Sequence, residues 1–256
     1  MIPKIIHYCW FGRGEMPDMV QKCIGSWHTY MPDWEYRLWN EASLSQTLSP
    51  LKGGEDCWLE HMPEYVREAY QAKKYAFLSD YVRLWALERE GGLYLDTDVE
   101  VLKTFEPLLN DTAFVGFEES LALLPATCVM ACEAHCQWVK DMLATYNDAC
   151  FIREDGTLDM TTNVQRLGKR MGQGGLQHER KVQYLPQWGL RIYTHDYFSP
   201  ITSTRVMRKS KNTYCIHQFA GTWMDDKKGG VHIWWIVREC VNILVQMKRF
   251  IGNLIR

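Results

Sequence analysis

Two aspartates separated by one residue, Asp96 and Asp98, follow directly after a short apolar run at residues 93–95. Alternate residues of an extended chain point the same way, so the two carboxylates repel each other unless a positive charge lies between them or both face water. A hard divalent cation such as Mg²⁺ or Mn²⁺ accepts oxygen ligands and keeps open positions for phosphate oxygens. The pair therefore predicts a metal site, although a solvated turn would carry the same two acids.

Aromatic side chains at two other places could form walls of such a site. Trp10 ends a β-prone run at residues 4–10. If this strand and the strand at 93–95 are parallel, a ligand would bind beyond their carboxyl ends, where the indole could stack on a nucleobase; a core tryptophan is the alternative. His217 and Trp223 follow a short strand and could form a third wall, although a satisfied core histidine fits the same pattern.

A charged pair lies on the longest helical pattern of the chain. Asp80 and Arg83 are three residues apart, so their side chains face nearly the same way on a helix. The apolar stripe through Phe77, Tyr81 and Leu84 leaves Asp80 at its margin. A charge at the edge of a buried stripe is either paired or directed at a ligand, and the pattern allows both.

The elements that must position these residues alternate along the chain, which predicts an α/β fold. The long helical pattern has a candidate break near residues 71–74 and ends at the capping signal Gly91-Gly92. We expect the other helices at residues 17–30, 137–146 and 158–172. We expect strands at residues 4–10, 34–39, 93–95, 99–102, 113–117, 127–132, 191–193 and 213–217.

Composition narrows the class of protein. The chain has 256 residues, of which 46% are hydrophobic, with a formal net charge of −2. These values suit one sizeable domain and lack the basic footprint of a nucleic-acid-binding protein. Nine scattered cysteines form no paired framework, which favours a reducing compartment. The N-terminus lacks an export-signal pattern and no apolar stretch is long enough to span a bilayer, so we expect a cytoplasmic protein.

The last segment, residues 229–256, predicts one amphipathic helix. Apolar residues alternate at spacings of four and three from Ile233 to Leu254, and basic residues lie elsewhere on its surface. Such a helix packs on its own domain or on a partner. The alternative is a helix lying in an anionic membrane surface, with Trp234 and Trp235 as interfacial anchors.

Four blocks together resemble a known family. They are IPKIIHYCWFG at 2–12, AKKYAFLSDYVRL at 72–84, GGLYLDTDVE at 91–100 and HQFAGTW at 217–223. In this order they resemble the bacterial capsular-polysaccharide branch of glycosyltransferase family 32. The wider relatives of that branch are yeast α-1,6-mannosyltransferases and the catalytic domains of clostridial glucosylating toxins. Residues 121–210 match only loosely. The resemblance implies a GT-A fold over residues 1–228, with a mixed, mostly parallel central sheet flanked by helices.

The resemblance also implies roles for individual residues. Asp98 would coordinate Mn²⁺ or Mg²⁺ directly, while Asp96 would contact the donor ribose or reach the metal through water. Many relatives have a second histidine where this chain has Gln218, so either His217 or Gln218 would complete the metal shell. The resemblance implies that Trp10 stacks on the base of the donor. Asp80 and Arg83 would hold the donor sugar and the diphosphate. His217 and Trp223 would close over the diphosphate, and Tyr8 and Tyr94 would also bind the donor.

The expected function is metal-dependent hexosyl transfer from a nucleotide-sugar, UDP-hexose or GDP-mannose, to a saccharide acceptor. UDP-N-acetylhexosamine as the donor stays open, and the acceptor is a lipid-linked saccharide or, as for the toxin relatives, a protein. The resemblance implies retention of anomeric configuration and a role in capsule or other surface-glycan synthesis, in the cytoplasm or at the inner membrane face. A phosphohydrolase of the haloacid-dehalogenase type also uses an Asp-x-Asp motif, but Glu100 departs from its pattern. A non-catalytic nucleotide-sugar-binding protein is the remaining alternative.

Overall fold

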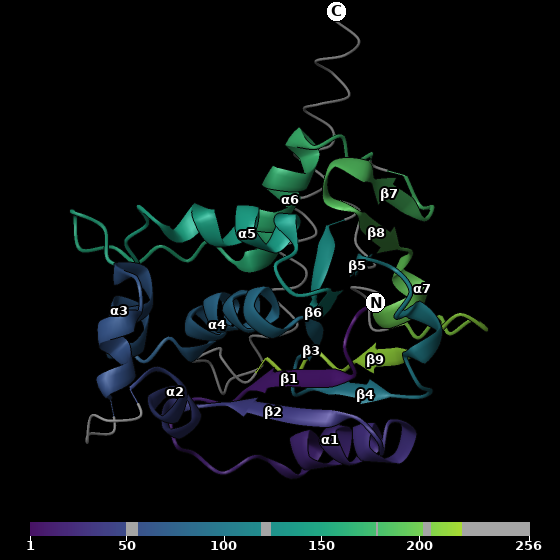
Figure 1. The fold of residues 1–256 in the computed structure, drawn as a ribbon, viewed down its shortest axis with the longest axis horizontal. Coiled ribbons are helices and arrows are strands. Elements are labelled where there is room, and N and C mark those ends of the chain that lie inside the picture. Colours follow the sequence, from purple (N-terminus) through teal and green to yellow (C-terminus); the bar gives the residue numbers. More distant parts are fainter. Residues whose placement is uncertain (50–55, 119–123, 178, 202–205, 222–256) are drawn as a thin grey trace, which may run out of the picture.

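The computed structural model describes residues 1–49, 56–118, 124–177, 179–201 and 206–221. A seven-stranded sheet with strand order β2-β1-β3-β6-β5-β8-β7 forms its centre (Figure 1). The strands are β1 (Ile5–Cys9), β2 (Glu35–Trp39), β3 (Gly92–Leu95), β5 (Ala113–Phe117), β6 (Pro125–Cys132), β7 (Gln183–Leu185) and β8 (Leu190–Tyr193). The pairs β1–β2, β1–β3 and β5–β8 are parallel, and the other three pairs are antiparallel. The predicted α/β class with a mixed sheet is confirmed, but the expectation of a mostly parallel sheet is wrong, because three of the six pairs are antiparallel.

Helices cover both faces of the sheet, and each face has its own apolar core. One core joins Leu78 and Leu84 of α4 to Met130 of β6, and the other joins Trp27 of α1 to Leu95 of β3. Figure 1 shows α1 and α4 on opposite sides of the β1–β2 edge. Every residue of β3, β5 and β6 is buried, as expected for strands covered on both faces. The helices are α1 (Asp18–Tyr30), α2 (Glu41–Leu48), α3 (Glu64–Gln71), α4 (Tyr75–Glu90), α5 (Gln137–Leu143), α6 (Asn163–Gln173) and α7 (His195–Phe198).

The long helical pattern is broken where the sequence indicates. Lys73 adopts a positive φ of 56° between α3 and α4. At the C-terminal end of α4, Gly91 has φ 65° and ψ −164°, a conformation that is strained for any residue other than glycine. Its N–H donates to the Leu87 carbonyl at 3.0 Å. The chain therefore turns directly from α4 into β3, which carries Asp96 to the carboxyl end of the sheet.

A second, two-stranded sheet lies beyond that end. It pairs β4 (Val99–Val101) antiparallel with β9 (Cys215–His217), and Val99 lies opposite His217. This pairing joins segments more than a hundred residues apart in sequence. It places the candidate histidine beside the Asp-x-Asp turn.

Some predicted bounds differ from the structure, and some predictions concern residues outside the described part. α6 begins at Asn163, five residues after the predicted start at 158, and β7 was not predicted. The short 3₁₀ helices are η1 (Cys57–His61), η2 (Glu106–Leu108), η3 (Ala144–Tyr146) and η4 (Pro186–Trp188). The predicted helix at 229–256, the boundary after residue 228, and Trp223 all lie outside the described residues. Within the described part, no helix combines the length and the apolar character needed to cross a membrane.

Candidate active site

The described residues contain one group of three side chains that could hold a metal ion, namely Asp96, Asp98 and His217. One ligand atom from each lies within 4.8 Å of the others. Backbone bonds fix the turn that carries the two acids: Asp96 N–H donates to the Cys128 carbonyl at 2.9 Å, and Val99 N–H donates to the Asp96 carbonyl at 3.0 Å. The turn is therefore anchored at both ends by sheet structure.

The Asp96 carboxylate uses one oxygen to bind the protein. Its Oδ1 accepts the Tyr94 hydroxyl at 3.0 Å and pairs with Arg83 Nη1 at 3.2 Å. No partner for Oδ2 exists among the described residues, and the side chain is 24% exposed. Burial raises the pKa of Asp96, the Arg83 charge acts against this, and neighbouring Asp98 adds to the rise.

Asp98 is held from the opposite side. Its Oδ2 accepts the Ala220 N–H at 2.8 Å, and its Oδ1 lies 3.3 Å from His217 Nε2. Burial would raise the pKa of Asp98, but the charge of His217 and the bonds from His217 and Ala220 lower it to about 2. The carboxylate is therefore ionised throughout the physiological range.

This donor set fits a divalent cation. The two carboxylates suit Mn²⁺ or Mg²⁺, and His217 adds an imidazole nitrogen within reach of both. Asp96 and Asp98 each bind the protein through one oxygen. Without a cation the group balances its charge through a protonated His217, whose pKa Asp98 raises against the effect of burial. A cation would take that role from the imidazolium, since a metal ligand must be deprotonated.

Asp80 and Arg83 form the internal ion pair that the sequence left as one alternative. Arg83 Nη2 lies 3.0 Å from Asp80 Oδ1, and both side chains are buried. Arg83 also donates to the Thr127 carbonyl at 2.8 Å and packs on the Tyr94 ring at 4.6 Å. It thus links Asp80 to Asp96, and its predicted contact with a diphosphate stays a prediction.

Asn163, at the start of α6, is a site residue that sequence reasoning missed. Its backbone N–H donates to Asp80 Oδ2 and its Nδ2 donates to the Asp80 carbonyl, both at 2.9 Å. The Tyr146 hydroxyl donates to Asn163 Oδ1 at 3.3 Å. The run Thr161-Thr162-Asn163 is a helix-start signal, and it could have marked the position but not the partner. Asp80 is therefore positioned from two helices.

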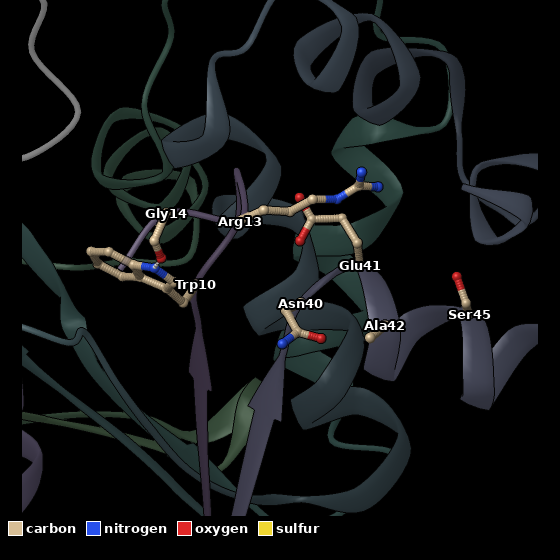
Figure 2. Close-up of a pocket in the computed structure, with 7 residues that line it drawn as sticks. All are labelled: Trp10, Arg13, Gly14, Asn40, Glu41, Ala42 and Ser45. Carbon is tan, nitrogen blue, oxygen red and sulfur yellow. Dashed lines mark hydrogen bonds between the residues drawn. The ribbon is translucent and has the colours of Figure 1, made fainter. Parts of the chain in front are cut away.

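Trp10 lies at the rim of a cavity and not in the core. Its indole N–H donates to the Gly14 carbonyl at 2.7 Å, and its backbone N–H binds the Trp39 carbonyl at 3.0 Å. The cavity measures about 570 Å³ and is lined by Trp10, Arg13, Gly14, Asn40, Glu41, Ala42 and Ser45. Figure 2 shows Trp10 and Gly14 on one side of it and the residues at the start of α2 on the other.

The cavity and the acid pair share one rim of the sheet. β1 pairs parallel with β3, with His7 opposite Tyr94, and Trp10 and the aspartate pair follow the carboxyl ends of these two strands. Neighbouring strands lie about 4.8 Å apart. The indole and the candidate metal group therefore both lie at the carboxyl ends of neighbouring parallel strands.

The remaining predicted site residues are Tyr94, Tyr8 and Gln218, and their contacts differ. Tyr94 contacts Asp96 as described, whereas Tyr8 packs edge-on against Trp27 with ring centroids 5.4 Å apart. Gln218 donates its side-chain amide to Glu100 at 2.8 Å and its backbone N–H to the Asp98 carbonyl at 3.0 Å. The metal role of Gln218 and the donor-binding role of Tyr8 stay predictions.

One segment of the chain matches a known protein family. Residues 17–115 match the model of the family described as "Glycosyltransferase sugar-binding region containing DXD motif". That segment contains Asp80, Arg83 and both aspartates of the Asp-x-Asp pair, while Trp10 and His217 lie outside it.

Two curated relatives come from the yeast Schizosaccharomyces pombe. Inositol phosphoceramide mannosyltransferase 3 is 32% identical over 117 residues, 44% of this chain and 29% of that protein. Inositol phosphoceramide mannosyltransferase 1 is 26% identical over 117 residues, 44% of this chain and 33% of that protein. The match thus spans about a third of each relative.

Solved structures show distant likenesses. The PaToxG glycosyltransferase has a TM-score of 0.43 and 21% identity, covering 56% of this chain and 59% of that one. A glycosyltransferase involved in glycosylation of the major capsid of PBCV-1 has a TM-score of 0.43 and 13% identity, covering 85% and 95%. The galactosyltransferase LgtC, in complex with donor and acceptor sugar analogs, has a TM-score of 0.33 and 16% identity, covering 64% and 69%.

Proposed function

We propose that this chain transfers a hexose from a nucleotide-sugar to a saccharide acceptor, a proposal supported by the match of residues 17–115 to the DXD-type sugar-binding region and by the similarity to the yeast mannosyltransferases. The observation that carries the proposal is the group of Asp96, Asp98 and His217 on the same sheet rim as the Trp10 cavity. The rim lies beyond the carboxyl ends of parallel strands, where open α/β sheets bind ligands. A GT-A arrangement of the sheet is part of this proposal.

The three side chains would hold Mn²⁺ or Mg²⁺. When bound, the cation supplies the positive charge that stabilises a departing nucleoside diphosphate. Trp10 presents an indole to the base, fixed in orientation by its bond to Gly14. Arg83 holds Asp96 in place and is itself paired with Asp80 of α4. The protein thus binds and orients the donor.

We propose that the transfer retains the anomeric configuration and uses no protein nucleophile. Asp80, the buried carboxylate next to the group, has both oxygens engaged by Asn163 and Arg83. A carboxylate so held is poorly placed to attack a sugar carbon, because it would have to give up both bonds. A phosphate oxygen of the leaving group would then accept the acceptor's proton.

The acceptor and the location belong to the same proposal. We propose a saccharide acceptor carried on a lipid, in capsule or other surface-glycan synthesis, and a cytoplasmic enzyme that contacts the inner membrane face. The names of the yeast relatives, which are mannosyltransferases of inositol phosphoceramide, support mannose as the sugar and a lipid as its carrier. The amphipathic pattern at 229–256 supports the membrane contact, and those residues lie outside the described structure.

An Asp98→Asn variant tests the proposal. Asparagine can still accept the Ala220 N–H but lacks the charge that a cation needs, so we expect the fold to persist and both Mn²⁺ binding and sugar transfer to be lost. Asp33→Asn is the matched control, because Asp33 is an exposed aspartate that pairs with Lys4. The measurements are Mn²⁺ binding by calorimetry, thermal stability, and turnover of a panel of nucleotide-sugars.

The outcomes separate the proposal from its alternatives. Full transfer by Asp98→Asn would remove the metal role. Release of inorganic phosphate without sugar transfer would favour a phosphohydrolase, and donor binding without turnover would favour a non-catalytic binding protein.

A further inference from the structure

We propose that Glu41 and Asn40 select guanine as the base of the nucleotide-sugar, an inference that rests on the proposed function and extends it to the donor's identity. Both residues line the cavity that Trp10 borders. They lie where β2 ends and α2 begins, and β2 is the strand that pairs with β1. A base stacked on the indole would direct its hydrogen-bonding edge toward them.

Each of the two side chains has one polar atom engaged and one available. Asn40 caps α2, with Oδ1 accepting the Ser43 N–H at 2.9 Å. Within the described part of the chain, its Nδ2 group has no hydrogen-bond partner. Glu41 accepts the Gly12 N–H through Oε1 at 2.9 Å, and its Oε2 has no partner among the described residues. The cavity therefore offers an amide donor beside a carboxylate acceptor.

These groups are fixed before a ligand arrives. Glu41 is only 5% exposed, and the Asn40 cap and reciprocal Ser43 bond hold the start of α2. The loop that binds Glu41 through Gly12 also holds the indole through Gly14. The stacking surface and the edge-reading groups thus belong to one rigid unit, which lowers the entropy cost of reading a base.

The order of donor and acceptor matches guanine better than other bases. The Watson–Crick edge of guanine presents a carbonyl oxygen followed by two N–H donors, so Asn40 can donate to O6 while Glu41 accepts from N1 and N2. Uracil has one N–H between two carbonyls, and one of these would face the carboxylate. Adenine offers one amino donor and one acceptor, and cytosine offers one amino donor and two acceptors, so neither base can give Glu41 two N–H donors.

Arg13 is the other charged side chain that lines the cavity. Arg13 pairs with Asp56 at 3.1 Å, and its side chain is 49% exposed. Ala42 contributes only a methyl group to the wall, which leaves room for a bicyclic base.

Nucleoside diphosphates test the inference on the unaltered chain. With Mn²⁺ present, calorimetry should show GDP binding at least about 10-fold more tightly than UDP, ADP or CDP. Inosine diphosphate lacks only the N2 amino group, so it should bind about 10-fold more weakly than GDP if Glu41 accepts from that group.

A Glu41→Gln variant tests the residue. Its carbonyl oxygen can keep the Gly12 bond, but its amide would face the donors of guanine, so GDP affinity should fall by about 10- to 100-fold and the difference between GDP and inosine diphosphate should disappear. Glu35→Gln is the control, because Glu35 is an exposed glutamate of β2 that pairs with Arg37. Should Glu41→Gln fail to fold, Asn40→Asp keeps a good helix cap while losing the amide donor, and it should lose GDP affinity likewise.

Failure of this inference can be told apart from failure of the proposed function. Equal binding of GDP and inosine diphosphate, tighter binding of UDP, or an unchanged base preference in Glu41→Gln would overturn guanine selection while a nucleotide-sugar is still turned over. If no nucleoside diphosphate binds and no sugar is transferred, the proposed function itself is wrong.

Discussion

Removing the Arg83 side chain should destabilise the fold strongly. It is 5% exposed and lies between two carboxylates, 3.0 Å from Asp80 and 3.2 Å from Asp96. Methionine fills similar space without charge or donors. An Arg83→Met variant would leave the buried carboxylates of Asp80 and Asp96 without the guanidinium that they share. The Thr127 carbonyl would also lose its hydrogen-bond donor.

The magnitude follows from the burial of the charges. Removing one partner of a buried ion pair costs about 3–5 kcal/mol, because the other charge stays buried and uncompensated. Part of this cost comes from Asp80 alone. An Asp80→Asn change in the Arg83→Met background neutralises that charge and can keep the contact with the Asn163 N–H, so it should restore about 1–2 kcal/mol.

Urea unfolding followed by far-UV circular dichroism measures these changes in the free energy of unfolding. Arg153→Met is the control: Arg153 pairs with Asp159 at 3.1 Å, but its side chain is 52% exposed, so the loss should stay below about 1 kcal/mol. The reasoning is refuted if Arg83→Met costs no more than this control. It is also refuted if Asp80→Asn lowers the stability of the Arg83→Met variant further.

Two further predictions concern the strands and turn that position the site. Burial lowers the pKa of His7 from 6.5 to about 4 in the folded protein. Between these two pH values the His7 imidazole is protonated in the unfolded chain but not in the folded one. The free energy of unfolding should therefore fall by about 3 kcal/mol from pH 7 to pH 4. Urea titrations at several pH values should show a smaller fall in the free energy of unfolding for a His7→Gln variant. The same dependence on pH in the variant and the unaltered chain would contradict this role of His7. Gly91→Ala should cost more than about 2 kcal/mol, since its Cβ would lie 2.6 Å from the Ala134 nitrogen at a positive φ. Thermal unfolding should show the opposite sign for Gly25→Ala, within α1 with open space around it.

The local elements around the candidate site were predictable from sequence. The β-prone run that ends at Trp10, the break near residue 73, and the turn at Gly91 all appear in the structure near their predicted positions. Each depends on propensities and capping signals within a few residues of the chain. Strand β7 was missed because three residues with a central exposed tyrosine carry no usable period.

The sequence by itself therefore determined the α/β character, the Asp-x-Asp turn at a strand end, and the candidate residues on each element. Only the tertiary structure decided which of them meet. The pairing of β4 with β9 sets His217 against Asp98, and the packing of α6 on β6 and α5 brings Asn163 to Asp80. The contact of Glu41 with the Gly12 loop likewise depends on β1 and β2 lying side by side. Propensity and periodicity act over a few residues, whereas these contacts depend on strand order and register, which are chosen by burial across the whole sheet.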